Sequence, residues 1–371
     1  MTKLQDLHNI HGQSPWLDDL RRDWLVDGTL DRWVDRGVRG ITSNPSIFQK
    51  AMAAGSAYDE QFAGLVDDGC SAQRSYWAMA TTDVADALDR LRPLYDESRG
   101  DDGFVSLELA PDLAHDAAGS LTAARRFHTD IARPNLLVKI PGTVEGVKAV
   151  RELIGQGCSI NITLIFSLRR HAEVMEAYLA GLEDLAGSDA GAASLSRVHS
   201  VASFFVSRVD VEIDRRLESI GTDEALGLRG RAAVAQAKLA YRQFRQVFSG
   251  PRWKALADTR ARVQRPLWAS TSTKSPDYPD TLYVDTLIGP DTVNTMPVAT
   301  LEAFEERGTL ADTAGEGADE AEALFDRLAA LGIDLEEVGR VLEDEGVAAF
   351  AKSFDQGISA LEEKASQLAS S

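Results

Sequence analysis

Short apolar runs alternate with longer amphipathic stretches along most of this chain, from residue 16 to about residue 297. Runs of this kind are typical of strands that are buried on both faces of a parallel sheet. We predict eight strands, at residues 16–18, 38–42, 104–109, 136–140, 159–166, 200–206, 266–270 and 293–296.

The stretches between these strands carry apolar residues at helical spacing. Residues 144–154 follow this pattern, and Gly155 and Gly157 end the predicted helix. Ser167 can cap the next helix, and two more helices are expected at about residues 208–219 and 228–248. Eight strand–helix repeats predict an α/β fold, a (β/α)8 TIM barrel. A doubly wound open sheet is the alternative, but no GxGxxG motif opens a helix after a strand.

Two regions are longer than a minimal barrel needs. Residues 45–103 predict several helices in an early crossover. Residues 301–371 predict acidic helices, with a break at residues 309–317, that wrap the barrel or cover one of its mouths. No internal repeat, low-complexity tract or Pro/Ser-rich linker divides the chain. We therefore predict one domain over residues 1–371, with residues 301–371 packed on the barrel.

The composition is that of a soluble globular protein, with 44% hydrophobic and 26% charged residues among 371. No apolar stretch is long enough for a membrane span, and no apolar signal core follows the N-terminus, so we expect a cytoplasmic protein. The net charge of −19 disfavours nucleic acid and anionic membranes as partners, and it requires a local basic cluster for any phosphate ligand. Cys70, Cys158 and the six histidines show no metal-binding spacing, so no metal or cofactor is expected.

Polar residues gather at the predicted C-terminal strand ends, where the active site of such a barrel lies. They are Asp18 or Asp19, Asn44, Glu108, Lys139, Asn161, Thr163, Ser203, Arg208, Ser270 and Lys274. Each alone has a structural explanation: a carboxylate can cap a helix or pair with an arginine, an asparagine can hold a turn, and Asn161 with Thr163 can form an internal polar layer. Together, unmatched groups in a barrel interior would cost about 1–3 kcal/mol each, so an active site explains them better.

Lys139 is the most informative of these residues. It lies in the apolar run 136–140, and only nine of the 39 basic residues are lysines. A lysine in an apolar wall loses hydration, so we expect its pKa to fall. Its neutral amine can then attack a carbonyl carbon and form a Schiff base. A lysine that extends to solvent, or a buried ion pair, is the structural alternative.

Schiff-base chemistry on a ketose also needs an acid/base relay, a second carboxylate for C–C cleavage and polar groups that hold the sugar. Glu108, on the strand next to Lys139, could exchange protons with it through an intervening water. Asp18 could supply the second carboxylate. Arg208 and Lys274 could bind a phosphate, the first as a fork of N–H donors and the second as a point charge.

Six segments carry a resemblance to a known family. They are GITSNPS at residues 40–46, SLEL at 106–109, LVKIPGT at 137–143, NITLIFS at 161–167, SFFVSRVD at 203–210 and WASTSTK at 268–274. In this order they resemble the transaldolase family, and the resemblance covers essentially residues 14–300. The chain length and WLDDL at residues 16–20 resemble the longer bacterial branch of that family.

The resemblance implies a sugar-phosphate transferase of the non-oxidative pentose phosphate pathway. It implies transfer of a dihydroxyacetone unit from sedoheptulose 7-phosphate to glyceraldehyde 3-phosphate, which gives erythrose 4-phosphate and fructose 6-phosphate. The resemblance implies that Lys139 is the Schiff-base nucleophile, that Glu108 acts through a water with help from Thr163, and that Asp18 is the general acid/base. It also implies that Asn44 and Asn161 contact the dihydroxyacetone unit. Ser203 would line the pocket, and Arg208 would bind the phosphate. Ser270 and Lys274 complete the expected substrate-binding set.

The sequence departs from the family's short branch at two places. Two adjacent aspartates follow the first strand, so Asp19 competes with Asp18, and the loop after the seventh strand carries Lys274 where an arginine is expected. An aldolase of the same Schiff-base type and a non-catalytic barrel that binds sugar phosphates stay open as alternatives. The sequence leaves the oligomeric state open, and a homodimer is one candidate.

Overall fold

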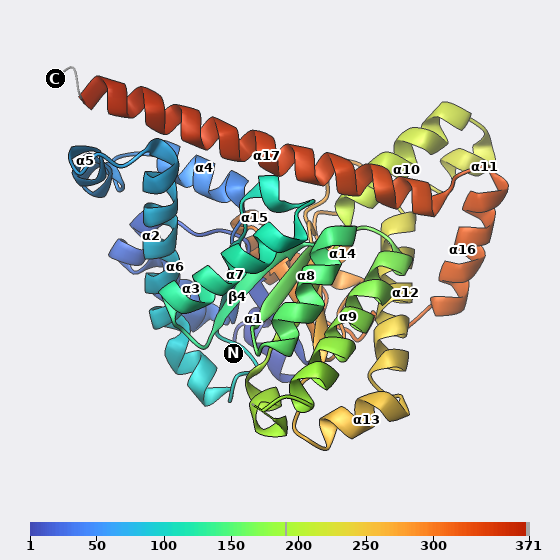
Figure 1. Ribbon diagram of the computed structural model, residues 1–371. Coiled ribbons are helices and arrows are strands. Elements are labelled where there is room, and N and C mark those ends of the chain that lie inside the picture. The colour runs from blue at the N-terminus through green and yellow to red at the C-terminus, as the bar shows by residue number, and fades with distance from the viewer. Residues whose placement is uncertain (190, 369–371) are drawn as a thin grey trace.

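The computed structural model describes residues 1–189 and 191–368, and it contains a closed barrel of parallel strands (Figure 1). The strands are β1 (Gln13–Leu17), β2 (Gly40–Thr42), β3 (Phe104–Glu108), β4 (Leu136–Pro141), β5 (Ile160–Ile165), β6 (Ser200–Phe205), β7 (Gln264–Ala269) and β8 (Thr292–Met296). They follow one another around the barrel in chain order, and β8 pairs with β1. The predicted (β/α)8 TIM barrel is confirmed, and each predicted strand overlaps an observed one.

The strand β1 differs most from its predicted bounds, because it begins at Gln13 and not at residue 16. Gln13 Nε2 donates to the Leu287 carbonyl oxygen at 2.7 Å and to Thr292 Oγ1 at 2.9 Å. Ser14 Oγ donates to Asp102 Oδ2 at 2.9 Å. These partners are distant in sequence. They allow polar side chains to be buried in a strand whose start carries no apolar signal.

Helices surround the barrel, including the several predicted for the early crossover. The α-helices are α1 (Lys3–Asn9), α2 (Arg22–Asp27), α3 (Thr29–Arg36), α4 (Pro45–Ala53), α5 (Asp59–Asp67), α6 (Ala72–Glu97), α7 (Ala117–Ile131), α8 (Val144–Gly155), α9 (Leu168–Ala186), α10 (Ser207–Ile220), α11 (Asp223–Leu226), α12 (Ala232–Val247), α13 (Pro251–Ala257), α14 (Leu282–Asp285), α15 (Val298–Arg307), α16 (Ala318–Ala330) and α17 (Leu335–Leu368). Short 3-10 helices are η1 (Pro111–Leu113) and η2 (Ala192–Arg197). The gap between α15 and α16 confirms the predicted break. No described helix combines the length and apolar character that a membrane crossing requires.

Side-chain caps fix the helices that leave β4 and β5. Ser167 Oγ accepts a hydrogen bond from Arg170 N at 3.1 Å, as predicted for the start of α9. Thr143 Oγ1 accepts one from Gly146 N at 3.0 Å and begins α8. Because each cap follows its strand closely, these helices start at the C-terminal mouth of the barrel.

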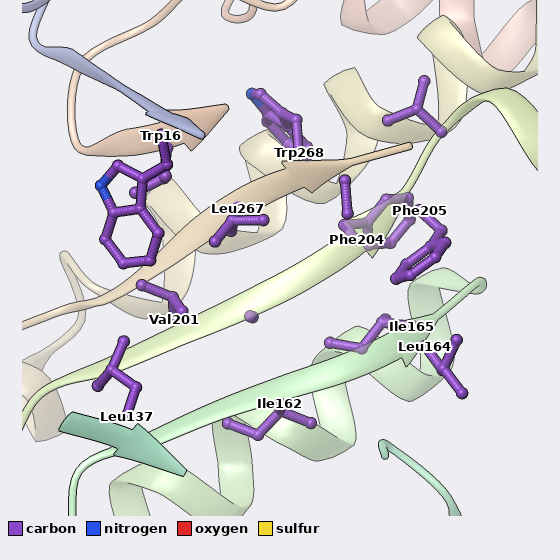
Figure 2. Close-up of a cluster of buried hydrophobic side chains, with 14 of the residues drawn as sticks. Trp16, Leu137, Ile162, Leu164, Ile165, Val201, Phe204, Phe205, Leu267 and Trp268 are labelled. Carbon is purple, nitrogen blue, oxygen red and sulfur yellow. The ribbon is translucent and has the colours of Figure 1, made fainter. Parts of the chain in front are cut away.

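The barrel interior changes from apolar to polar along the strands. Figure 2 shows Trp16, Leu137, Val201 and Leu267 gathered within the barrel, and all four are buried. Side chains two positions apart on a strand share a face. Lys139 on β4 and Ser203 on β6 therefore follow Leu137 and Val201 into the interior, nearer the C-terminal mouth. An apolar floor lies beneath the polar residues.

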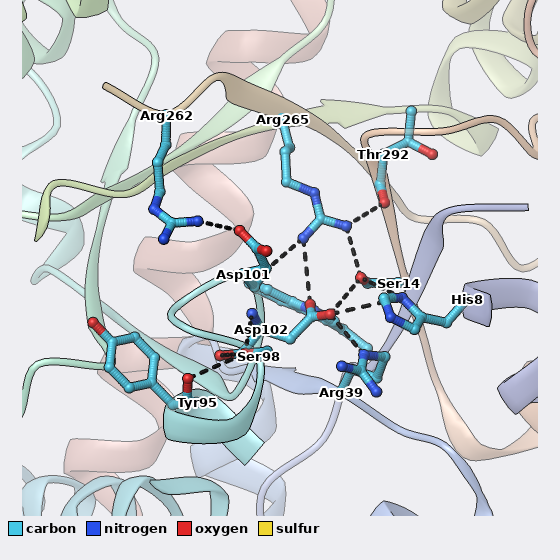
Figure 3. Close-up of polar contacts among 11 residues, drawn as sticks. His8, Ser14, Arg39, Tyr95, Ser98, Asp101, Asp102, Arg262, Arg265 and Thr292 are labelled. Carbon is cyan, nitrogen blue, oxygen red and sulfur yellow. Dashed lines mark hydrogen bonds and ion pairs between the residues drawn. The ribbon is translucent and has the colours of Figure 1, made fainter. Parts of the chain in front are cut away.

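A network of ion pairs closes the opposite, N-terminal end of the barrel (Figure 3). Asp102, whose side chain is 1% exposed, accepts hydrogen bonds from Arg39 Nε at 2.6 Å and Ser14 Oγ at 2.9 Å. Arg265 Nη1 donates to Asp102 Oδ1 at 3.3 Å, and its Nη2 donates to Ser14 Oγ and to the Thr292 carbonyl oxygen, both at 2.7 Å. These contacts join β1, β7 and β8 with the segments that precede β2 and β3.

The long helix α17 crosses the C-terminal end of the barrel, at the top of Figure 1, and contacts α4, α6, α10 and β5. Two glycines allow this close approach. A Cβ at Gly339 would lie 2.8 Å from Ser167 Cβ, and one at Gly346 would lie 2.9 Å from Leu164 Cδ2. Since such distances are shorter than van der Waals contact, larger residues would push α17 away from the strand ends.

Candidate active site

A cavity of about 530 Å³ opens at the C-terminal end of the barrel. The predicted site residues that line it are Asp18, Asn44, Lys139, Thr163, Ser203, Arg208, Ser270 and Lys274. The two others, Glu108 and Asn161, are buried beside it, and each contacts a lining residue. The structure therefore brings the predicted set together at one mouth of the barrel.

Lys139 lies at the floor of this cavity and is 4% exposed. Its Nζ lies 2.9 Å from Glu108 Oε2 and donates to the Ser43 carbonyl oxygen at 3.2 Å. Glu108 and Lys139 are paired in the register of β3 and β4, which places their side chains in direct contact. The two groups are in direct contact in this structure, and the water-mediated relay stays a prediction. The buried ion pair is present, and a cavity adjoins it.

Burial raises the pKa of Glu108, and the nearby Lys139 charge opposes this shift without cancelling it. The Asp18 carboxylate raises it further. A carboxylate with a raised pKa is a better proton acceptor. Transfer of the ammonium proton from Lys139 to Glu108 would leave the neutral amine that nucleophilic attack requires.

Two adjacent aspartates reach the cavity wall, and neither caps α2. Thr42 Oγ1 donates to Asp18 Oδ1 at 2.7 Å. Burial raises the pKa of Asp18, against the opposing effects of Lys139 and of this hydrogen bond. Burial also raises the pKa of Asp19, to about 6, and the main opposing charge there is Arg21. The largest opposing charge is therefore Lys139 for Asp18 and Arg21 for Asp19.

Asn161 lies in a buried polar layer, as its structural alternative predicted. Ser203 Oγ donates to Asn161 Oδ1 at 2.7 Å, and Asn161 Nδ2 donates to Ser106 Oγ at 3.0 Å. Thr163 differs, because it lines the cavity and its buried Oγ1 has no hydrogen-bond partner within the described ranges. That hydroxyl can bond to a ligand or a water in the cavity.

Asn44 caps a helix, where a turn was its predicted structural role, and its predicted contact with substrate stays a prediction. It is the N-cap of α4, and its Oδ1 accepts a hydrogen bond from Ile47 N at 3.0 Å. It also lines the cavity. Because the cap uses Oδ1 of the side chain, the side chain is held in one orientation at the cavity wall.

Basic side chains occupy one side of the cavity. Arg208 lines it and, among residues 1–189 and 191–368, has no carboxylate within ion-pair distance. Burial lowers the pKa of Arg208, and burial followed by the Arg208 charge lowers that of Lys274. Lys274 Nζ donates to Ser272 Oγ at 3.0 Å. Ser270, which has a left-handed φ of 57°, bonds Ser207 through the two hydroxyls at 2.8 Å.

Several lining residues were not predicted from the sequence, and Lys50 and Phe350 are two of them. Ile47, Lys50 and Ala51 all line the cavity at helical spacing on α4, which starts directly after Asn44, so the motif that contains Asn44 could have pointed to Lys50. Phe350 comes from α17, far along the chain. Its apolar spacing indicates a buried helix face but not the surface against which that face packs. Within the parts of the chain described, no cluster of His, Cys, Asp and Glu could hold a metal ion.

The sequence profile of the Transaldolase/Fructose-6-phosphate aldolase family matches residues 15–361. Among similar proteins, the Transaldolase of Mycolicibacterium smegmatis is 51% identical over 349 residues, 93% of each chain. Transaldolase 1 of Streptomyces coelicolor is 49% identical over 94% of this chain and 92% of its own. The Transaldolase of Thermobifida fusca is 48% identical over 95% of both. This chain belongs to the transaldolase/fructose-6-phosphate aldolase family.

Proposed function

We propose that this protein is a transaldolase that moves a dihydroxyacetone unit from sedoheptulose 7-phosphate to glyceraldehyde 3-phosphate through a Schiff base on Lys139. One observation carries the proposal most directly: the Lys139 amine is buried, lies 2.9 Å from Glu108 and faces a cavity of about 530 Å³. A cavity of this size accommodates a small phosphorylated sugar. The names of the relatives support the same activity.

In the proposed first half-reaction, the neutral Lys139 amine attacks the donor ketone carbon. Glu108 accepts the ammonium proton beforehand and returns a proton to the carbinolamine oxygen, which leaves as water. The Thr163 hydroxyl, which has no partner in the described ranges, is placed to hold that oxygen. Asp18 then takes the proton from the substrate hydroxyl as the C–C bond breaks. An aldose phosphate leaves, and a three-carbon enamine stays on Lys139.

In the second half-reaction the enamine carbon attacks the aldehyde of the acceptor, and the same steps run in reverse. Asp18 returns its proton to the new hydroxyl, and hydrolysis of the imine frees fructose 6-phosphate and the lysine. Asn44 and Ser203 are proposed to contact the sugar hydroxyls. Asn161 is proposed to act mainly by orienting Ser203, since the two are hydrogen-bonded at 2.7 Å.

The transfer test separates this function from its nearest alternative, a sugar-phosphate aldolase. With sedoheptulose 7-phosphate as donor, fructose 6-phosphate should form only when glyceraldehyde 3-phosphate is added, and erythrose 4-phosphate should match it in amount. Release of free dihydroxyacetone at the same rate without acceptor would favour the aldolase. The family description names both a transaldolase and a fructose-6-phosphate aldolase, so this measurement decides between the two activities.

The two aspartates should differ sharply in their contribution to kcat. Asp18→Asn is expected to lower kcat by about 10²–10⁴-fold, the usual range for loss of a general acid/base. Asp19→Asn is the matched control, and we expect a change below about tenfold because the main charge opposing burial of Asp19 is Arg21, whereas that of Asp18 is Lys139. Steady-state transfer rates measure both. The opposite order would assign the acid/base role to Asp19.

Arg208 is proposed to bind the substrate phosphate, with Lys274 and Ser270 beside it. Arg208→Ala should raise KM for phosphorylated substrates by roughly 10–100-fold with a smaller change in kcat. This is expected for loss of a charge-assisted contact that is equally strong in the ground state and in the transition state. Arg21→Ala is the control, because Arg21 also lines the cavity but already pairs with Asp23. An unchanged KM in Arg208→Ala would remove Arg208 from the phosphate site.

The remaining proposals concern the context of the enzyme. The family supports sugar phosphates as the ligands, and Arg208 and Lys274 supply the local basic groups that a phosphate needs against a net charge of −19. The same charge argues against nucleic acid or an anionic membrane surface as a partner. A cytoplasmic location stays a proposal. A homodimer stays a proposal that sedimentation of the purified protein tests.

A further inference from the structure

The roof of the cavity is built by α17, a helix that begins at Leu335, after the last strand of the barrel. Phe350 is the one residue of this helix that lines the cavity among those described. Its ring centroid lies 5.8 Å from Lys139 Nζ and 6.0 Å from the guanidinium carbon of Arg208. The ring therefore faces both the reactive amine and the proposed phosphate ligand. At 7% exposure it is itself shielded from solvent.

The position of this ring is set by close packing on both sides of it along α17. Gly346 lies one turn before Phe350, where a Cβ would come within 2.9 Å of Leu164 Cδ2 and 3.5 Å of Arg208 Nη1. Phe354 lies one turn after it and packs edge-on against Tyr76, with ring centroids 5.0 Å apart. Both contacts hold α17 down on the strand ends, and Phe350 between them points into the site.

An apolar roof has a specific consequence for a group-transfer reaction. The three-carbon unit waits on Lys139 between departure of the first aldose and arrival of the second. If water reaches it in that interval, a proton adds to the enamine carbon and water adds to the resulting imine carbon. The C–N bond then breaks, the lysine amine is regenerated and dihydroxyacetone leaves. Each such event consumes one water and wastes one donor.

We propose that Phe350 is a specificity-determining residue that limits water access to the Lys139 intermediate and so favours transfer over hydrolysis. This inference rests on the proposed function, because it concerns the fate of the same Schiff base. A phenyl ring offers the cavity no hydrogen-bonding partner for water, and its face is compatible with the positive charge of an iminium. The transferase or aldolase character of the site thus depends on a residue contributed by the C-terminal helix.

The test compares two aromatic residues on the same helix. Phe350→Ala should raise the ratio of acceptor-independent dihydroxyacetone release to transfer by about tenfold. Phe354→Ala is the matched control: Phe354 is 8% exposed and equally part of the helix packing, but it does not line the cavity. For Phe354→Ala, the ratio of dihydroxyacetone release to transfer should equal that of the wild-type protein, even if this variant loses as much stability as Phe350→Ala.

Phe350→Leu keeps an apolar cover with a smaller area and should raise the ratio by an intermediate factor; it also serves if Phe350→Ala does not fold. A ratio that rises equally in the Phe354 variant, or in neither Phe350 variant, would overturn the inference. Absence of transfer by the wild-type protein would instead defeat the proposed function, so the two failures are distinguishable.

Discussion

Lys139→Ala is expected to lower kcat/KM for transfer by about 10⁴-fold or more, because no covalent intermediate can form without the amine. Loss of a contact that binds the ground state and the transition state equally would lower kcat/KM far less. Two other lysines, Lys50 and Lys274, line the same cavity but lie outside the buried pair with Glu108. Initial rates measured over a range of donor concentrations at fixed acceptor give kcat/KM and so measure the loss. Activity that survives within about tenfold would remove Lys139 from the chemistry.

This substitution also leaves Glu108 buried without its cation, so stability needs its own control. Burial raises the pKa of Glu108, and loss of Lys139 removes the main opposing effect. A carboxyl whose folded-state pKa is raised binds protons more readily in the folded state, so the variant should lose stability as pH rises through that pKa. Adding Glu108→Gln should restore stability at neutral pH but not activity. A double variant that regains activity would contradict the proposed roles of both residues.

Asp102→Ala is expected to lower the free energy of unfolding by about 3–5 kcal/mol, the usual cost of removing one partner from a buried ion pair. It would leave Arg39 and Arg265 without their carboxylate at the N-terminal end of the barrel, where Figure 3 shows them converging on it. Asp101→Ala is the neighbouring control. Asp101 is 66% exposed and pairs with Arg262, so its loss should change stability by less than about 1 kcal/mol.

Urea unfolding at neutral pH measures both variants. A single transition is expected, because we propose that residues 1–371 form one domain. Burial would raise the pKa of Asp102, but Arg265 and Arg39 more than offset it, and the pKa lies below its usual value. The stabilisation is therefore present above the ordinary aspartate pKa and is lost as pH falls toward the folded-state pKa. Equal effects of the two substitutions would show that the network adds nothing beyond a surface pair.

The barrel and most of the site followed from local features of the sequence. An apolar run interrupted by Lys139 identifies a strand and its unusual residue together, and the rule that strand ends meet at one mouth brings Asp18, Asn44 and Arg208 to the same cavity. Ser167 marks the start of α9 because a helix N-terminus needs an acceptor for its free amides.

Features that depend on distant segments could not be predicted. The early start of β1 depends on Thr292 and Asp102, which satisfy its polar side chains from far along the chain. Direct contact between Glu108 and Lys139 depends on register and side-chain conformation, which the sequence leaves open. Phe350 reaches the cavity only because α17 folds back over the barrel. An apolar helix face does not specify its partner surface.

The most direct test of the central claim is the site of a trapped adduct. The protein is incubated with fructose 6-phosphate, reduced with borohydride, digested and analysed by mass spectrometry. We expect a reduced three-carbon or hexose phosphate adduct on the peptide that contains Lys139, and none in Lys139→Ala. An adduct on another lysine, or transfer activity with no adduct at all, would contradict the account.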